Sequence, residues 1–215
     1  MERRPNRLRY CLDNNIPTIS TRIESPWAYM TELAAASGYF DFIEYEGEYA
    51  PHTEEDLEDV CRAAELYDCA TVVKIDRQNR EFMAQKAIAC GAQGILFADL
   101  YTAEEVAQTL DAIKSSYPGG GIMGRANRRH CMNGSGRMLH GEYRKQTDET
   151  VNMIMIEKVD AMKNLEAICQ VPGVDMLVYG PFDYALGGVL CASKAIHGEA
   201  LRLLNATDEG LSVLP

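Results

Sequence analysis

The sequence predicts an α/β fold, a (β/α)8 TIM barrel with a short eighth strand and no eighth helix. Short apolar runs alternate with amphipathic segments along the chain, which is typical of βα units that build a parallel sheet. The runs recur at the spacing that a strand, a helix and two loops require. With 215 residues, 47% of them hydrophobic, the chain can form one sizeable core and is short for two domains. We therefore predict a single domain over residues 1–215.

Seven strands are expected from the apolar runs. They are Thr18–Ile23, Phe40–Glu46, Thr71–Ile75, Gly94–Ala98, Gly121–Met123, Asn152–Glu157 and Asp175–Tyr179. Leu211–Leu214 follows a turn at residues 207–210 and is the expected eighth strand, although the same residues also fit a frayed tail. An eighth strand is favoured because a closed barrel leaves no unpaired edge.

Helices are expected between the strands. They are Pro26–Ser37, Thr53–Tyr67, Thr102–Ile113, Ala161–Cys169 and Ala192–Asn205. Thr53 is followed by three acidic residues, which suit the positive end of a helix. Thr102 and Glu105 have the spacing of a capping box. These signals place helix starts shortly after strand ends.

The composition excludes several classes of protein. A formal net charge of −11 argues against non-specific binding to nucleic acid. No apolar run approaches the roughly 20 residues that span a bilayer, and the basic segment Met1–Arg7 leads into no apolar stretch of a secretory signal. Seven scattered cysteines without a CxxC pair indicate reduced thiols. We therefore expect a soluble cytoplasmic protein with no membrane or nucleic-acid partner.

Positive charge is concentrated in one stretch of the sequence. Its members are Arg125, Arg128, Arg129, Arg137, Arg144 and Lys145, together with His130 and His140. The stretch can be a solvated loop and helix face. It can also be an electropositive rim that attracts an anionic substrate such as a carboxylate. The sequence leaves both interpretations open.

Charged residues gather at the predicted carboxyl ends of the strands, where barrels of this kind have their active sites. These residues are Glu46, Glu48, Lys74, Asp76, Asp99, Glu157 and Asp183. Converging carboxylates repel one another unless a cation and a basic residue lie among them. Glu157 and Asp183 follow apolar strands and are candidate oxygen ligands of Mg²⁺ or Mn²⁺. The alternatives are a buried ion pair for Glu157 and a helix cap for Asp183.

Several segments at these strand ends resemble those of a known family. They are Phe40–Ile43 with Glu46-Gly47-Glu48-Tyr49-Ala50-Pro51, Val72–Ile75, Gly91–Leu96 with Thr102–Glu105, Ile156-Glu157, Val171–Asp175 and Gly180-Pro181-Phe182-Asp183. Together they resemble the HpcH/HpaI aldolase family, the class II metal-dependent 2-oxo-acid (pyruvate) aldolases, from about Ile16 to Gly188. Ile156-Glu157, Val171–Asp175 and Gly180-Pro181-Phe182-Asp183 match the sixth and seventh units of that family.

This resemblance implies a (β/α)8 barrel that assembles as a homo-oligomer, usually a hexamer built as a trimer of dimers. It implies that Glu157 and Asp183 bind a divalent metal (Mg²⁺, Mn²⁺ or Co²⁺) and that the substrate is a small anionic 2-oxo acid of the pyruvate or oxaloacetate type. The catalytic positions it indicates are Tyr49, Lys74 and Glu46. The substrate-binding positions are Lys74, Gly180, Pro181, Phe182 and Arg125.

The chain departs from the family pattern at three of these positions. Lys74 stands where the family has arginine, Tyr49 where it has histidine, and Glu46 where it has aspartate. Lysine keeps a positive charge but loses the two-pronged guanidinium. A tyrosine with a pKa near 10 is only about 0.1% ionised at neutral pH, so it is a poor base and a competent proton donor.

Three functions follow as hypotheses. The first is a metal-dependent carbon–carbon lyase that works through the enolate of a 2-oxo acid. The second is redirected enolate chemistry on the same scaffold, either decarboxylation or a citrate-type condensation. The third is a non-catalytic homologue that binds a small molecule, because a fold does not by itself define a function.

Overall fold

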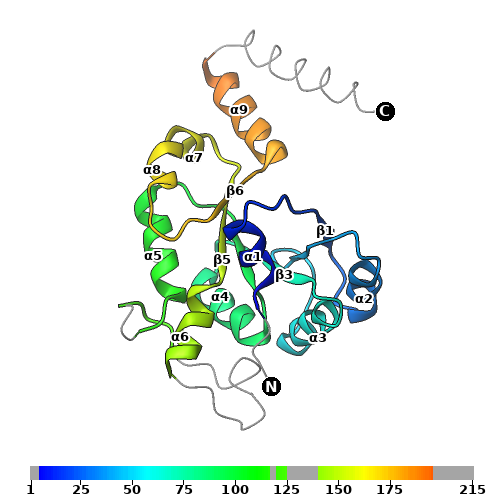
Figure 1. Ribbon diagram of the computed structural model, residues 1–215. Coiled ribbons are helices and arrows are strands. Elements are labelled where there is room, and N and C mark those ends of the chain that lie inside the picture. The colour runs from blue at the N-terminus through cyan, green and yellow to red at the C-terminus, as the bar shows by residue number, and fades with distance from the viewer. Residues whose placement is uncertain (1–4, 117–119, 125–139, 196–215) are drawn as a thin grey trace.

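The computed structural model describes residues 5–116, 120–124 and 140–195. Within them, one sheet of six parallel strands runs in sequence order, as an open half-barrel (Figure 1). The strands are β1 (Ser20–Ile23), β2 (Phe42–Glu46), β3 (Ala70–Ile75), β4 (Gly94–Phe97), β5 (Val151–Ile156) and β6 (Met176–Tyr179). β1 and β6 are the two edges of this sheet.

Helices precede or follow each strand. They are α1 (Arg7–Asp13), α2 (Ala28–Ala36), α3 (Glu54–Glu65), α4 (Arg80–Cys90), α5 (Ala103–Ile113), α6 (His140–Asp148), α7 (Val159–Lys163), α8 (Leu165–Cys169) and α9 (Pro181–Ala195). The start of α3 has a full capping box, in which Thr53 and Asp56 bond each other's backbone N–H groups. At α5, Thr102 accepts from the N–H of Glu105, but the Glu105 carboxylate accepts from Tyr101. The predicted capping box of Thr102 is thus only half formed.

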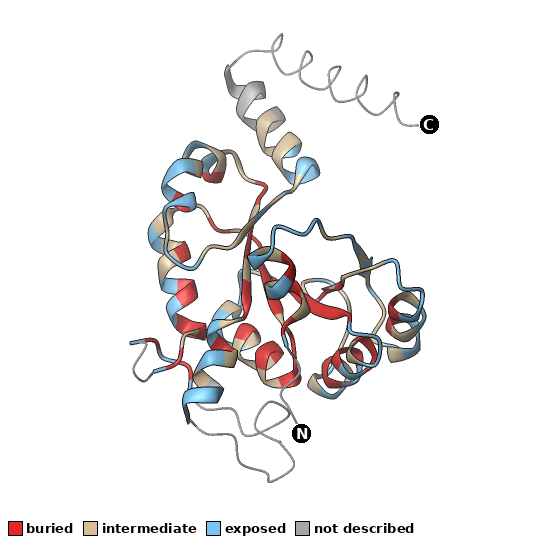
Figure 2. Cartoon of the chain, in the orientation of Figure 1, coloured by how far each residue is buried: buried red, intermediate tan, exposed pale blue. Residues whose placement is uncertain are grey.

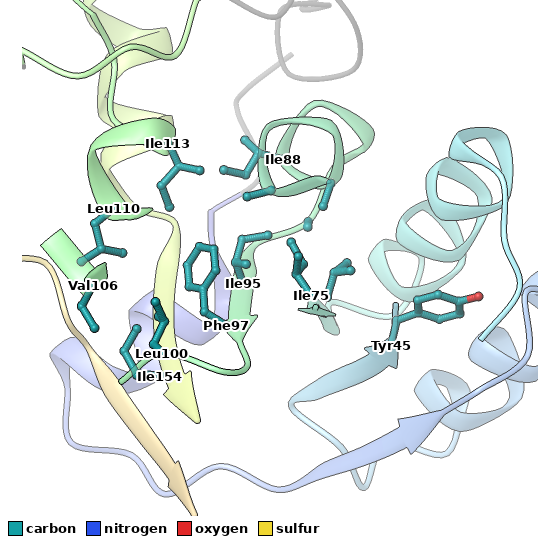
Figure 3. Packing of buried hydrophobic residues seen from close by; sticks show 14 of the residues in the cluster. Tyr45, Ile75, Ile88, Ile95, Phe97, Leu100, Val106, Leu110, Ile113 and Ile154 are labelled. Atoms are coloured by element: carbon teal, nitrogen blue, oxygen red, sulfur yellow. The ribbon is translucent and has the colours of Figure 1, made fainter. Parts of the chain in front are cut away.

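The larger apolar core lies between the sheet and helices α3, α4 and α5. Figure 3 shows outward-facing strand residues such as Ile95, Phe97 and Ile154 packed against Leu110 and Ile113 of α5. Every residue of β3 and β4 is buried, and Figure 2 shows this as a red centre to the sheet. A strand that is covered on both faces of the sheet carries apolar residues on both faces. The few charged residues at the ends of these strands are therefore candidates for a functional site.

A second apolar cluster fills the concave side of the half-barrel. It joins Leu8 of α1 to inward-facing residues such as Phe42, Val72, Leu96 and Met153. The short helix α1, which the sequence did not reveal, therefore closes the amino-terminal end of the half-barrel. The opposite end, where the strands finish, carries the charged side chains.

The predicted strand Gly121–Met123 is wrong. Met123 makes only an isolated bridge with Ser115, and β4 pairs directly with β5. The N–H of Met123 donates to the carbonyl of Lys114, and the N–H of Ile122 donates to the carbonyl of Asp111. The segment therefore lies against the end of α5. A short apolar stretch can make such a bridge as readily as a strand. The strands predicted as sixth and seventh are consequently β5 and β6.

Other expectations meet different outcomes. The other six strands expected before residue 180 all exist, with one or both ends shifted by one or two residues. Helices α1, α4 and α6 were not predicted, Ala161–Cys169 is two short helices, and α9 begins well before the predicted helix Ala192–Asn205. Closure into eight strands stays a prediction, since Leu211–Leu214 lies outside the described residues. Among the described helices, none is long and apolar enough to cross a membrane.

Candidate active site

Three charged side chains are buried where the central strands end. Glu46 ends β2, Lys74 precedes the last residue of β3, and Glu157 follows β5 directly. Their exposed fractions are 1%, 5% and 5%. Glu46 and Lys74 are paired across neighbouring strands, and the charges of Lys74 and Glu157 influence each other's pKa. The carboxyl ends of parallel strands share one edge of the sheet, so these groups form one site.

Lys74 is held between two carboxylates. Its Nζ lies 2.5 Å from Glu48 Oε2 and 3.5 Å from Glu46 Oε2. Burial lowers the pKa of Lys74, but the hydrogen bond to Glu48 and both carboxylate charges outweigh burial and raise the pKa above its usual value. Lys74 therefore stays an ammonium ion, suited to stabilising an anion and unsuited to nucleophilic attack.

Arg22 of β1 is a second cation at Glu46, and it was absent from the predicted site. Its Nη2 bonds Glu46 Oε2, the oxygen that faces Lys74, and its Nε lies 3.2 Å from Glu24 Oε1. Glu46 is thus fixed from two sides by β1 and β3. Side chains alternate between the two faces of a strand, so the sequence indicates that Arg22 can point inward. It does not indicate which acid Arg22 contacts.

Tyr49 extends from the loop after β2 and is 74% exposed. The Lys74 Nζ lies 5.3 Å from the centre of its ring. The pKa of the Tyr49 hydroxyl is raised, first by its hydrogen bond with Glu48, then by burial and by the charges of Glu48, Asp183 and Asp99. A raised pKa keeps the hydroxyl protonated, so Tyr49 can donate a proton and is a poor base.

Glu157 is positioned by its two neighbouring strand ends. Its Oε1 accepts from the backbone N–H of Asp99 at 3.2 Å. Gly180, after β6, leaves room for it, because a Cβ at that position would lie 2.7 Å from Glu157 Cβ and 3.2 Å from Oε2. Burial raises the pKa of Glu157. A buried carboxylate of this kind gains most from a nearby cation.

Asp183 and Asp99 are joined by a lysine that the sequence did not single out. Lys158 directly follows Glu157, and its Nζ lies 3.1 Å from Asp99 Oδ1 and 3.5 Å from Asp183 Oδ1. Asp183 stands in the first turn of α9, and its side chain is 51% exposed. Since the charge of Asp183 also raises the pKa of Tyr49, the β5–β6 side of the site adjoins the β2–β3 side.

The other predicted site residues divide into three groups. Pro181 and Phe182 begin α9, and Phe182 is 81% exposed beside the site. Arg125 lies outside the described residues, as does most of the basic stretch. Arg144 and Lys145 of α6 line a hollow of about 510 Å³ with Asn152 at the amino-terminal ends of the strands. These two residues are on the opposite end of the sheet, so the predicted basic rim of the site does not include them.

The donor atoms suit a hard divalent cation. In the described part of the chain, no three side chains from His, Cys, Asp and Glu form a metal-binding group. Glu157 and Asp183 are the two carboxylates that the family resemblance indicates, and water and substrate would complete the shell. Mg²⁺ commonly keeps several waters and uses one or two carboxylates. Glycine at position 180 also keeps the space beside Glu157 Oε2 free, since a Cβ there would lie 3.2 Å from that oxygen.

Parallel strands with acids and a lysine at their carboxyl ends define a barrel-type enzyme of the α/β class. The profile of the HpcH/HpaI aldolase/citrate lyase family matches residues 23–201. The chain therefore belongs to this family of carbon–carbon lyases, as the sequence resemblance indicated.

Two relatives are each named 2-keto-3-deoxy-L-rhamnonate aldolase. The protein of Salmonella gallinarum is 30% identical over 189 residues, covering 86% of this chain and 67% of the relative. That of Klebsiella pneumoniae is 30% identical over 161 residues, covering 75% of this chain. The chain spans only 58% of the length of the Klebsiella relative.

Solved structures agree on the fold. An HpcH/HpaI aldolase from Desulfitobacterium hafniense superposes with a TM-score of 0.73 at 21% identity, over 91% of this chain and 73% of its own. The citrate synthase SbnG superposes with a TM-score of 0.72 at 24% identity, over 86% and 69%. These likenesses establish a TIM-barrel-like fold, and the described residues contribute six strands to it.

Proposed function

We propose that this protein makes or breaks a carbon–carbon bond through the enolate of a small 2-oxo acid. The observation that carries the proposal is the meeting of Lys74, Glu46 and Glu157, all at least 95% buried, where three parallel strands end. Burial of an ammonium and carboxylates costs free energy that their pairing offsets only in part, and such clusters are common at functional sites. Family membership supplies the reaction class.

Glu157 and Asp183 would hold a divalent cation, Mg²⁺, Mn²⁺ or Co²⁺. When bound, such a cation would polarise the keto group of a 2-oxo acid. Lys74 would stabilise the negative charge that develops on the enolate oxygen, and Glu46 would keep Lys74 in place. Gly180 and Pro181 would border the bound acid, and Phe182 would cover its outer side.

Tyr49 would act as the proton donor. In the bond-forming direction the new alkoxide needs a proton, and the raised pKa of Tyr49 keeps that proton available. This favours a citrate-type condensation as the second candidate reaction on the same site. Aldol cleavage requires the reverse transfer, to a group that is deprotonated at rest, for which Tyr49 is less suited.

The test is the exchange of methyl protons of pyruvate in D₂O with Mg²⁺, followed by ¹H NMR. In this exchange the methyl proton passes to solvent and a deuteron returns from it, so enolate formation is measured without knowledge of the second substrate. The wild type should exchange these protons, and Asp183→Ala should reduce exchange to the background while remaining folded. Metal-dependent binding of pyruvate without exchange, and without turnover of oxaloacetate, would instead favour a non-catalytic binding protein.

Tyr49→Phe separates the two roles of this residue. A donor that acts after the enolate has formed should leave pyruvate exchange unchanged and lower kcat of the complete reaction far more than KM. An unchanged kcat would remove Tyr49 from the mechanism. With a donor, the rate should stay flat through neutral pH and fall only above the usual tyrosine pKa of about 10.

Location and assembly complete the proposal. We propose a cytoplasmic homo-oligomer. Five cysteines, Cys11, Cys61, Cys69, Cys90 and Cys169, are free thiols, four buried and one exposed, which supports a reducing compartment. Exposed apolar side chains on the first and last strands or their helices, such as Trp27, Leu33, Tyr179 and Leu186, support a covered surface in the assembly.

A further inference from the structure

Lys158 is placed to neutralise two acids from different elements. It follows Glu157 and is the residue before α7, and its side chain is 27% exposed. Its Nζ reaches Asp99, which follows β4, and Asp183 on α9. A single ammonium therefore links the two sides of the strand that carries Glu157.

We propose that Lys158 is a built-in counter-cation that competes with a divalent metal for the carboxylate of Asp183. This inference rests on the proposed function, since it takes Glu157 and Asp183 as metal ligands. The ammonium neutralises Asp99 and Asp183 when no divalent cation is bound, and a bound divalent cation displaces it from Asp183.

The charges around Lys158 support this role. Its ammonium lies 3.1 Å from Asp99 Oδ1 and 3.5 Å from Asp183 Oδ1, and Glu157 is its neighbour in the chain. The side chain therefore carries its positive charge throughout the ordinary pH range. Two like charges at one pair of carboxylates repel, so the lysine and a divalent cation oppose each other's binding.

The size of the effect follows from Coulomb's law. A unit charge and a dication about 6 Å apart in water-like surroundings repel enough to weaken binding about tenfold. Lys158→Met removes the charge and keeps the aliphatic chain. It should therefore tighten Mn²⁺ binding about tenfold.

Lys163 provides the matched control. It lies at the end of α7, 2.8 Å from Asp160, with both side chains 68% exposed. Lys163→Met makes the same change in net charge away from the carboxylates of the site. Since exposed charges are screened by water and salt, this variant should change Mn²⁺ affinity less than about twofold.

The experiment measures Mn²⁺ affinity by calorimetry and by electron paramagnetic resonance on the whole chain, with thermal unfolding as a second readout. In EDTA, Lys158→Met should unfold at a lower temperature than the wild type, because Asp99 and Asp183 lose their cation. Saturating Mn²⁺ should then raise its Tm by more than it raises that of the wild type.

Two results separate the inference from the proposed function. If Asp183→Asn abolishes Mn²⁺ binding but Lys158→Met binds no tighter than the wild type, the competition by Lys158 is overturned and the metal site stands. If neither the wild type nor Lys158→Met binds Mn²⁺, the metal site and the inference both fail. Tighter binding in Lys158→Met, and not in Lys163→Met, supports the inference.

Discussion

Gly180→Ala tests whether the end of β6 shapes the site through contact with Glu157. The added Cβ would lie 2.7 Å from Glu157 Cβ, whereas carbon atoms pack best at about 3.5–4.0 Å. One of the two backbones, or the Glu157 side chain, must therefore move by about 1 Å. Overpacking of this kind costs about 1–3 kcal/mol. For a chain of this size we expect the Tm to fall by about 2–12 °C.

The same substitution should weaken metal binding, because Glu157 cannot move without carrying its carboxylate away. Loss of a supporting contact around metal ligands commonly reduces affinity about 10–100-fold, and we expect Mn²⁺ affinity of Gly180→Ala in this range. Calorimetric unfolding and Mn²⁺ titration measure the two effects on one sample.

Gly188→Ala is the matched control. Gly188 lies in α9, and a Cβ there would have no described heavy atom within 4 Å. Alanine is favoured over glycine within a helix by about 1 kcal/mol, so this variant should be as stable as the wild type or more so. It should also bind Mn²⁺ normally. If Gly180→Ala matches the wild type in Tm and in Mn²⁺ affinity, the packing of Glu157 against position 180 is refuted.

Three further predictions concern other parts of the molecule. Burial raises the pKa of Tyr45 to about 12, so its protonated hydroxyl contributes stability that is lost as pH rises from about 10 through that value. In denaturant titrations, Tyr45→Phe should lack this alkaline loss of stability. At neutral pH it should be as stable as the wild type, because the buried Oη has no hydrogen-bond partner among described residues. The same decrease of unfolding free energy with pH in both proteins would contradict this. Asp175→Asn should lower the free energy of unfolding by about 2–4 kcal/mol, since Arg9 loses contacts of 2.7 and 2.6 Å with the carboxylate. Asp13→Asn is the control and should cost under about 1 kcal/mol, because Asp13 lies 4.0 Å from Arg9 and its side chain is 63% exposed. Equal costs would refute the role of the Arg9–Asp175 pair. Light scattering should find a homo-oligomer. Trp27, the chain's only tryptophan, is 63% exposed in the single chain, so burial in the assembly should shift its fluorescence emission to shorter wavelength than that of an exposed tryptophan. A monomer at micromolar concentration would argue against this.

The position of the site could be predicted from the sequence because buried strands are easy to recognise there. An apolar run that ends in Glu157 or Lys74 places that charge at a strand end, and parallel strands bring such ends together. The structure brings together Glu46, Lys74 and Glu157 as expected. Their roles in catalysis and metal binding stay predictions.

The partners of these charges could not be predicted, because they depend on which elements become neighbours. Arg22 meets Glu46 only through the pairing of β1 with β2. Lys158 looks like an ordinary solvated residue before a helix until Asp99 and Asp183 approach it. Local patterns carry the period of a strand or helix but no information on contacts between distant segments.

The errors in the fold have a similar physical origin. Gly121–Met123 was too short for its apolar character to separate a strand from a bridge. The helix α1 has only seven residues, and its anchoring comes from distant groups: Asn6 Nδ2 donates to the carbonyls of Gln93 and Glu149, and Arg9 pairs with Asp175. Short helices of this kind gain their stability from tertiary contacts more than from propensity.

The charge balance of the site gives a reason why the proposed reaction would depend on a divalent cation. Around the carboxyl ends of β1 to β6, three cations lie among a larger number of acids. The cations are Arg22, Lys74 and Lys158, and the acids around them include Glu46, Glu48, Asp99, Glu157 and Asp183. Each of the three cations already contacts a carboxylate. An incoming 2-oxo acid would therefore meet more carboxyl groups than cations, and its own carboxylate would be repelled. A divalent cation removes that excess and lets Glu157 ionise despite its burial. Binding of pyruvate should accordingly be far weaker in EDTA than in Mg²⁺, and equal affinity in both would contradict this account.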